Sequence, residues 1–200
     1  MKLIYSAASP FARKVNVLLR ETGQTDDVDL VEVATTPVST PSEVRAANPI
    51  GKIPALIRED GPALYDSRVI CRYLDDRAGA GLYPASEIWE MLTLEATADG
   101  LMDAAVLMVY EGRVRPEHLI YDDWVEAQWG KVSGALDALN DRWMSHLNGP
   151  LSIGQIAVGC ALGYLDFRHG ARNWREGRGD LDDWYAIFAE RDSMKATAPD

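Results

Sequence analysis

Strand patterns occur only in about the first 80 residues of this chain, and every later apolar pattern has helical spacing. The predicted elements of the first part are, in chain order, a strand at 2–5, a helix at 10–22, strands at 28–33, 55–58 and 63–65, and a helix at 67–77. Glu59-Asp60-Gly61 separates the last two strands and predicts a hairpin between them. The order β-α-β, a long connection and then β-β-α is typical of a compact α/β unit.

The remainder of the chain is predicted to contain helices alone. After Ala78-Gly79-Ala80-Gly81, which has the composition of a linker, apolar residues recur at steps of three and four. The segments that show this spacing lie at 94–109, 125–143, 151–169 and 181–188. We therefore predict an α/β domain at 1–78, a linker at 79–86 and an all-helical domain at 87–200.

The chain is acidic, with a formal net charge of -11 over 200 residues. A negative surface repels phosphate backbones and anionic lipids, so we expect neither nucleic acid nor a membrane as a partner. The longest apolar stretch, Ala104–Tyr110, is far shorter than the ~18 residues that indicate a membrane span. An anionic small ligand would need a local positive site, and a helix N-terminus supplies one.

The cysteines and histidines indicate a reduced protein without a metal centre. Cys71 and Cys160 lie far apart, each within a helical apolar pattern, so both are expected to be buried and reduced, which is typical of a cytoplasmic protein. His118, His146 and His169 make no metal-ligand spacing with either cysteine. We therefore expect no metal. The first residues lack the apolar core of a signal peptide, so we expect a cytoplasmic location.

Ser9-Pro10 at the start of an amphipathic run is first of all a helix start, with serine as the N-cap and proline at the first helical position. The free N–H groups and the positive dipole end of a helix start also stabilise a sulfur anion. A free thiol has a pKa of roughly 8.5, and lowering it by two units takes ~2.7 kcal/mol. One hydroxyl hydrogen bond plus the helix terminus can supply this free energy. Serine itself cannot exchange disulfides, so redox chemistry through this position is excluded.

Asn48-Pro49-Ile50-Gly51-Lys52-Ile53-Pro54 directly precedes the third predicted strand. One interpretation is a turn that enters the strand with an ordinary trans proline. The other is a cis Pro54, which would leave the backbone of Ile53 unpaired and able to bind an extended, peptide-like ligand. The sequence leaves both open.

Tyr65-Asp66-Ser67-Arg68 ends a strand and opens a helix. Helix capping alone explains the Asp66-Ser67 pair. The same residues also offer N–H groups and a hydroxyl for a carboxylate, and a carboxylate for an ammonium group. A ligand that carries both groups on one carbon, such as an α-amino acid head, would fit.

Leu151-Ser152-Ile153-Gly154-Gln155-Ile156 has the pattern of a capping box with a hydrophobic staple. In this pattern Ser152 caps the helix, Gln155 reaches back to it, and Leu151 meets Ile156. We interpret the segment as a folding signal and not as a site.

Taken together, in this order and with these spacings, the four segments resemble the cytosolic glutathione transferase family, and the bacterial, serine-type members in particular. The resemblance covers nearly the whole chain, and SPF, NPxGKIP, DS and the S-x-x-Q segment carry it. It implies a thioredoxin-like N-terminal domain and a helical C-terminal bundle. It departs from the family at Gln155, where the family usually has Asp.

The resemblance implies a role for each matching position. Ser9 would face the sulfur of glutathione, with Tyr5 as the alternative because tyrosine-type members place their catalytic phenol there. Residues implied to hold glutathione are Ser9, Lys52, Ile53, Pro54, Asp66, Ser67 and, from the partner copy of a homodimer, Asp103, with Asp99 as its rival. Residues expected beside the electrophile are Phe11, Met108, Tyr110 and Arg113.

The function implied is conjugation of the glutathione thiolate to apolar electrophiles, a detoxification chemistry, with glutathione as a substrate and no metal or other cofactor. The alternative is a non-catalytic protein of the same fold that binds apolar ligands or partner proteins. The chain keeps four of the residues that the resemblance implies to hold glutathione, which favours the enzyme. They are Ile53, Pro54, Asp66 and Ser67.

Overall fold

The structure, a computed structural model, describes residues 1–199. The described chain divides into two compact units, one formed by Met1–Ala85 with the segment that begins at Asp192, and the other by Ser86–Arg191. Elements of the first unit are, in chain order, β1 (Lys2–Tyr5), α1 (Pro10–Glu21), η1 (Thr25–Asp27), β2 (Asp29–Glu32), α2 (Ser42–Ala47), β3 (Ala55–Ile57), α3 (Ser67–Ala78) and α9 (Asp192–Lys195).

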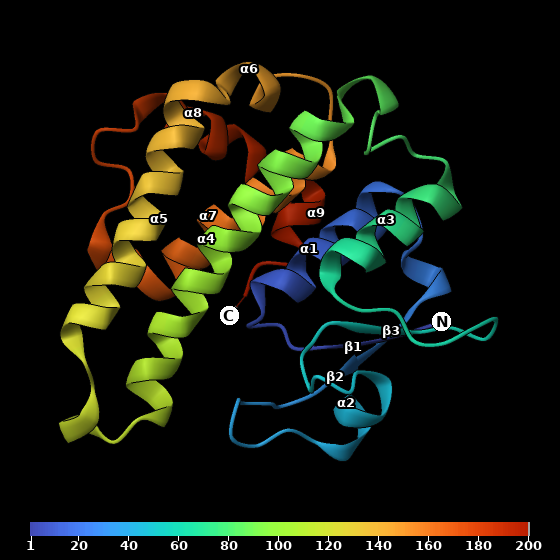
Figure 1. Cartoon of the computed structure of the whole chain (residues 1–200). Coiled ribbons are helices and arrows are strands. Elements are labelled where there is room, and N and C mark those ends of the chain that lie inside the picture. The colour runs from blue at the N-terminus through green and yellow to red at the C-terminus, as the bar shows by residue number, and fades with distance from the viewer. Residues whose placement is uncertain (200) are drawn as a thin grey trace. The chain divides into compact units, whose positions relative to one another are not determined.

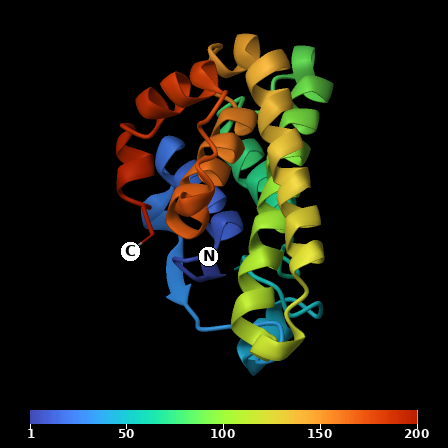
Figure 2. The ribbon, with the colours of Figure 1, turned by 90° about the vertical axis from the view of Figure 1, so that its left-hand side faces the viewer.

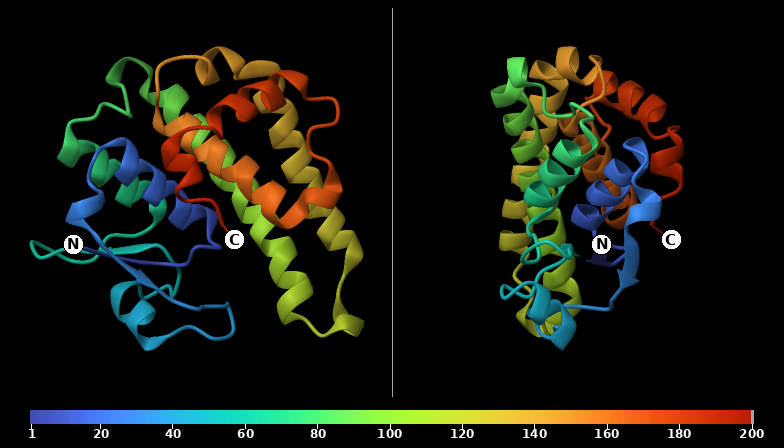
Figure 3. Two further views of the ribbon diagram at one scale, coloured as in Figure 1. Left: turned by 180° about the vertical axis from the view of Figure 1, so that it is seen from behind. Right: turned by 90° about the vertical axis from the view of Figure 1, so that its right-hand side faces the viewer.

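The first unit is built on a mixed three-stranded sheet of order β2-β1-β3. β1 pairs with β2 in parallel and with β3 in antiparallel orientation, so that Ile4 lies opposite both Val31 and Ala55. Helices α1 and α3 lie on one side of the sheet and α2 on the other (Figures 1 and 3). The mixed sheet with helices on both faces confirms the thioredoxin-like prediction.

Adjacent residues of β1 explain why both faces are covered. Leu3 and Ile4 are both buried, and successive side chains of a strand point to opposite faces. Ile4 packs in a cluster with Val44 and Ala47 of α2 and with Ala55 of β3. Leu3 therefore faces the side on which α1 and α3 lie. If helices covered only one face of the sheet, the apolar side chains on the other face of β1 would be exposed to water.

The predicted fourth strand, 63–65, is reduced to a single antiparallel bridge between Leu56 and Leu64. The two residues exchange backbone hydrogen bonds of 2.9 and 2.8 Å. Pro62 has no N–H to donate, and its carbonyl accepts from the Arg58 side chain at 3.1 Å, so the ladder ends there.

The second unit is helical. Its elements are α4 (Ile88–Val114), η3 (Glu117–Leu119), α5 (Asp122–Arg142), α6 (Met144–Leu147), α7 (Ile153–His169), η4 (Gly170–Arg172) and α8 (Gly179–Phe188), and η2 (Ala85–Glu87) lies at the junction with the first unit. α4 and α5 run side by side (Figure 2). α7 is the central helix, since every residue from Ile153 to Leu165 is buried. A Cβ at Gly154 would lie 2.6 Å from Leu94 Cδ2, so only glycine allows this close packing of α7 on α4.

The capping box predicted at the start of α7 is wrong. Ser152 is the N-cap residue, but its side chain makes no capping hydrogen bond, and its buried Oγ has no hydrogen-bond partner in the described structure. The Gln155 amide instead donates away from the helix, with Nε2 within 3.1 Å of the carbonyl oxygens of His146, Leu147, Gly149 and Pro150. Gln155 thus ties the preceding loop to the helix.

The two observed units differ from the predicted α/β domain at 1–78, linker at 79–86 and helical domain at 87–200. Asp200, the last residue of the predicted helical domain, lies outside the described residues. The C-terminal segment packs with the first unit because it supplies hydrogen-bond partners to α1. Arg13 donates to the Met194 carbonyl at 2.9 Å and to Thr197 Oγ1 at 3.3 Å, and Ser193 Oγ donates to the Glu21 carboxylate.

Both cysteines are buried as expected, Cys71 in α3 and Cys160 in α7. None of the helices within residues 1–199 combines the length and the apolar character that crossing a membrane requires.

Candidate functional site

Ser9 begins α1, as predicted. Its backbone is extended, with φ -87° and ψ 119°, and its Oγ accepts a hydrogen bond from the Ala12 N–H at 3.3 Å. Pro10 takes the first helical position and removes one of the unpaired N–H groups that a helix start carries. Ser9 is half-buried, so a hydroxyl and the positive end of α1 lie together at a position that a ligand can approach.

The segment before β3 is held by one buried side chain. Asn48, only 2% exposed, donates to the Lys52 carbonyl at 2.8 Å and accepts from the Ile50 N–H at 3.0 Å. Gly51 has φ 74°, a conformation that favours glycine. The Ile53–Pro54 peptide bond is cis. Ile53 makes no backbone–backbone hydrogen bond within the part of the chain that the structure describes.

Asp66 caps α3. Its two carboxylate oxygens accept from the Arg68 N–H at 3.0 Å and from Arg68 Nη2 at 2.9 Å. Partial burial by itself would raise the pKa of Asp66, but the hydrogen bonds and the charge of Arg68, with a contribution from Lys14, lower the pKa below its usual value. Asp66 is therefore ionised at neutral pH. Ser67 follows at the first helical position and is 3% exposed.

The fold brings these three segments to one end of the first unit. Ile4 pairs with Ala55, so the end of β1 lies beside the start of β3 and its preceding proline. The C-terminal ends of α1 and α3 are joined through Gln24, which donates to the Leu74 carbonyl at 2.9 Å and accepts from Arg77 at 2.6 Å. Because the two helices pack along each other, their N-termini also lie at one end, as Figure 1 shows. Two helix N-termini and a strand start therefore meet there.

Lys14 is a part of this region that sequence reasoning missed. It lies in the second turn of α1, is completely buried, and its charge contributes to the lowered pKa of Asp66. A cation near a helix N-terminus is unfavourable for the helix itself. Arg13-Lys14, two residues beyond Ser9-Pro10, was the available signal, since two cations close to a helix start favour an anion nearby.

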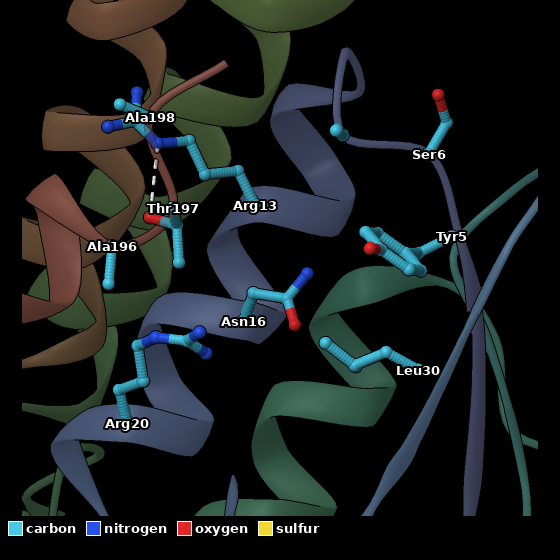
Figure 4. A pocket seen from close by; sticks show the side chains of 10 residues that line it. Tyr5, Ser6, Arg13, Asn16, Arg20, Leu30, Ala196, Thr197 and Ala198 are labelled. Carbon is cyan, nitrogen blue, oxygen red and sulfur yellow. Dashed lines mark hydrogen bonds between the residues drawn. The ribbon is translucent and has the colours of Figure 1, made fainter. Parts of the chain in front are cut away.

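Tyr5 lies at a different place from Ser9. Its ring lines a cavity beside Asn16 and Arg20 of α1, and Ser9 is not among the lining residues (Figure 4). Burial raises the pKa of the Tyr5 phenol, the charge of Glu32 raises it further, and Arg20 opposes both. The phenol is therefore protonated at neutral pH.

The remaining predicted residues are located as follows. Lys52 is exposed, and Phe11 is half-buried on α1. Four of the others lie on α4 of the second unit: Asp103 and Arg113 are exposed, Tyr110 is half-buried and Met108 is buried, while the rival acid Asp99 is buried. Among residues 1–199, no three His, Cys, Asp or Glu side chains gather as a metal site would need.

Comparison with protein families gives two matches. Residues 8–77 match the glutathione S-transferase N-terminal domain, and residues 122–186 match the glutathione S-transferase C-terminal domain. A GST-like protein of Escherichia coli (strain K12), YibF, which is itself uncharacterized, is 32% identical over 204 residues, covering 100% of this chain and 98% of the relative.

Solved structures agree over the full length. A glutathione transferase family member from Pseudomonas fluorescens Pf-5 with bound glutathione is 44% identical, with a TM-score of 0.97 over 100% of this chain and 98% of the other. A second structure from that organism, with bound S-(propanoic acid)-glutathione, is 43% identical with a TM-score of 0.92 and covers 100% of both chains. The chain belongs to the glutathione S-transferase family, and the thioredoxin-like sheet and helical second unit are those of its bacterial members.

Proposed function

We propose that this chain is a glutathione transferase in which Ser9 and the N-terminus of α1 stabilise the thiolate of glutathione. The observation that carries the proposal is the position of the half-buried Ser9 hydroxyl at the start of α1, at the same end of the unit as Ile53 and Asp66. Bound glutathione in a relative that is 44% identical over the whole chain supports it.

The chemistry needs no covalent bond to the protein. Glutathione gives its thiol proton to solvent, the sulfur electron pair attacks an electrophilic carbon, and the leaving group departs with the electron pair of the bond that breaks. The chain contributes ionisation of the thiol and placement of the sulfur. The Ser9 O–H donates to the sulfur, while the N–H groups of the first turn of α1 provide a positive field. Phe11, Met108, Tyr110 and Arg113 are the residues we expect beside an apolar electrophile.

The γ-glutamyl end of glutathione carries a carboxylate and an ammonium group. We assign the carboxylate to the N-terminus of α3 with Ser67, and the ammonium to Asp66, which is ionised at neutral pH. The backbone of Ile53 would pair with the cysteinyl part as an added strand, beside the cis Pro54. Lys52, exposed in the same loop, is suited to the ligand's other carboxylate.

Asp66→Asn is expected to raise the KM for glutathione roughly tenfold with little change in kcat, because a charge-assisted hydrogen bond is lost. Asparagine caps a helix as well as aspartate does, so α3 should stay folded. Asp60→Asn, at an exposed hairpin acid that pairs with Arg58 at 3.5 Å, is the matched control. Steady-state kinetics check the result, and an unchanged KM in Asp66→Asn would remove Asp66 from the site.

We further propose that two copies meet at one face of α4, where Asp103 would reach the partner's glutathione. Leu92, Asp103 and Leu107 are exposed at helical spacing along this face, and Trp89 at the start of the helix is 75% exposed. Large apolar side chains that gather on a surface mark interaction sites.

Replacing both Leu92 and Leu107 by glutamate is expected to convert a dimer into a monomer of 22.1 kDa, because four like charges would then face one another across the interface. Light scattering after gel filtration measures the mass. Leu119→Glu changes a more exposed leucine outside α4 and should leave the dimer intact. A monomeric parent protein would refute this part of the proposal.

The alternative, a non-catalytic binding protein of the same fold, makes a different prediction. Retention on immobilised glutathione followed by conjugation of a generic aryl halide is expected for the enzyme. Retention without conjugation of any electrophile would favour the alternative. A cytoplasmic detoxification role is the setting that we propose for the enzyme.

A further inference from the structure

Two arginines of the second unit, Arg113 near the end of α4 and Arg168 near the end of α7, form no ion pair with any described residue. The three arginines that follow α7 each pair with an acid, namely Arg172 with Glu126, Arg175 with Asp166 and Asp182, and Arg178 with Asp137. Acids are plentiful, since the chain has 31 of them against 20 lysines and arginines. The unpaired state of Arg113 and Arg168 therefore calls for a reason.

The two arginines lie close enough to repel each other. α4 and α7 pack together, and the end of α7 is held by a hydrogen bond of 2.9 Å between His169 Nε2 and the Ala105 carbonyl. Burial lowers the pKa of Arg168, and the charge of Arg113 lowers this pKa further. The dipole of a helix favours a cation at its C-terminus, which explains one arginine on each helix. It does not explain two that repel each other, whereas a shared anion does.

No carboxylate of the chain neutralises this arginine pair. The acids nearest to it along α4 and α7 are paired elsewhere, Glu111 with Arg115 and Asp166 with Arg175. Glu117, four residues after Arg113, is exposed and forms no ion pair with it. Among residues 1–199, the charged groups that shift the pKa of Arg168 include no carboxylate. The local charge is therefore positive in a chain whose formal net charge is -11.

Tyr164, one turn before Arg168 on α7, adds an unused hydrogen-bond donor. Its side chain is only 5% exposed, and its hydroxyl makes no hydrogen bond to any residue that the structure describes. The hydroxyl is not among the fully buried atoms without a partner, so a ligand can reach it. Burial raises the pKa of the Tyr164 phenol to about 12, against the charges of Arg168 and Arg113. The phenol is therefore protonated and can donate to an anion.

Aromatic rings adjoin these polar groups. The guanidinium carbon of Arg168 lies over the Phe167 ring, 3.6 Å from its centre, and the rings of Phe167 and Tyr164 have centres 6.5 Å apart. A guanidinium that lies over a ring keeps the N–H groups of its edge available for a carboxylate. Tyr110, one turn before Arg113 on α4, is half-buried and adds another ring. A ligand here meets cations at one end and aromatic surface beside them.

We propose that the electrophile that this chain accepts is an aromatic acid, whose carboxylate is bound by Arg113, Arg168 and the Tyr164 hydroxyl. A carboxylate has lone pairs for all three donors, and the fork of a guanidinium matches its geometry. The aromatic ring of the acid lies against Tyr110 and Phe167. Because this site rests on the proposed function, in which Tyr110 and Arg113 lie beside the electrophile, the bound acid is the molecule that the sulfur of glutathione attacks.

Two chlorodinitrobenzene derivatives test the proposal, one with a carboxylate and one with a carboxamide para to the chlorine. In both, the sulfur of glutathione displaces chloride, and the thiol proton passes to solvent. The kcat/KM of each is divided by the rate constant of its uncatalysed reaction with glutathione. In the parent protein this quotient should be at least about tenfold higher for the acid than for the amide.

Arg113→Gln and Arg168→Gln should each lower this acid-to-amide ratio at least about fivefold, because each removes a charge-assisted hydrogen bond. Tyr164→Phe should lower the ratio about threefold through the KM of the acid, since a single neutral donor is lost. Arg142→Gln changes an exposed arginine in the last turn of α5 and is the matched control, which should keep the parent ratio.

A parent ratio near one, or a ratio that neither arginine variant changes, would overturn the proposal. Circular dichroism checks that each variant is folded. Arg168→Lys, which keeps the charge without the fork geometry, replaces Arg168→Gln if the latter fails to fold, and it should lose part of the ratio. If the amide is conjugated and the acid is not preferred, only this proposal fails. If neither halide is conjugated, the proposed transferase function fails, and the assignment of the acid as its substrate fails with it.

Discussion

Replacing Ser9 by alanine is expected to lower the turnover of conjugation by about ten- to a hundredfold while glutathione still binds. A hydrogen bond to a charged group contributes about 1.5–3 kcal/mol, and each 1.36 kcal/mol of lost transition-state stabilisation is about a factor of ten in rate. The N-terminus of α1 remains in the variant, so part of the stabilisation of the thiolate should persist. The loss should therefore be large but incomplete.

The same substitution also removes a helix cap, because Ser9 Oγ accepts from the Ala12 N–H. Ser9→Asn separates the two roles, since asparagine caps a helix but carries no hydroxyl. It should be as stable as the parent protein and as inactive as Ser9→Ala. Ser9→Thr keeps both cap and hydroxyl and should retain activity. A stable, active Ser9→Asn would show that the serine acts only as a cap.

Tyr5→Phe tests the alternative assignment, in which the Tyr5 phenol and not the Ser9 hydroxyl faces the sulfur of glutathione. The Tyr5 phenol lines a cavity with Asn16 and Arg20, and Ser9 is not part of that lining. Its removal should leave conjugation unchanged. The ultraviolet absorbance of the bound thiolate, followed against pH, gives the pKa of the glutathione thiol in each variant. A pKa that rises in Tyr5→Phe and not in Ser9→Ala would reverse the assignment.

Local signals in the sequence were sufficient for most of the fold. The strand at 2–5 coincides with β1, and the helix at 10–22 differs from α1, Pro10–Glu21, by one residue at its end. Serine followed by proline and Asp66 before an amphipathic run are start signals that neighbouring residues decide, so both caps were predicted correctly. The last predicted strand, 63–65, was overestimated because a β-ladder depends on its partner as well as on its own residues.

The features that the sequence did not reveal depend on residues far apart in the chain. Arg13 and Thr197 are hydrogen-bonded across 184 positions, so neither the packing of the C-terminal segment on α1 nor the cavity beside it follows from a local pattern. Two cations close to the start of α1 point to an anion nearby, but only the packed structure reveals that Lys14 is completely buried. Local patterns predict where elements begin, whereas burial and pairing follow from the tertiary contacts.

The start of α7 shows how a correct helix boundary can rest on the wrong interaction. Ser152 and Gln155 have the spacing of a capping box, in which the residue at the third helical position accepts a hydrogen bond from the N-cap N–H. In the structure the Gln155 amide donates to loop carbonyls instead, while Leu147, whose carbonyl is one of them, also accepts from the Trp184 indole at 2.8 Å. The two arrangements demand opposite hydrogen-bonding groups from residue 155.

Gln155→Glu is therefore expected to reduce the free energy of unfolding by about 3 kcal/mol, because a buried donor becomes an acceptor facing four carbonyl oxygens. This corresponds to a decrease in Tm of about 6 to 12 °C for a chain of this length. A capping box would give the opposite result, since glutamate is a preferred residue there. Thermal and urea unfolding at neutral pH measure the change.

Ser152→Ala is the companion variant. A capping serine would cost about 1 kcal/mol when replaced by alanine, but the Ser152 Oγ is buried without a hydrogen-bond partner in the described structure. Its removal should change the free energy of unfolding by less than about 0.5 kcal/mol. The loss of unfolding free energy in Gln155→Glu should also become smaller as the pH falls toward about 4.3. A protonated carboxyl group can again donate a hydrogen bond to the loop carbonyls. If Gln155→Glu left the stability unchanged and Ser152→Ala lowered it, the result would support the capping box. It would contradict a stabilising role for the hydrogen bonds between Gln155 and the loop.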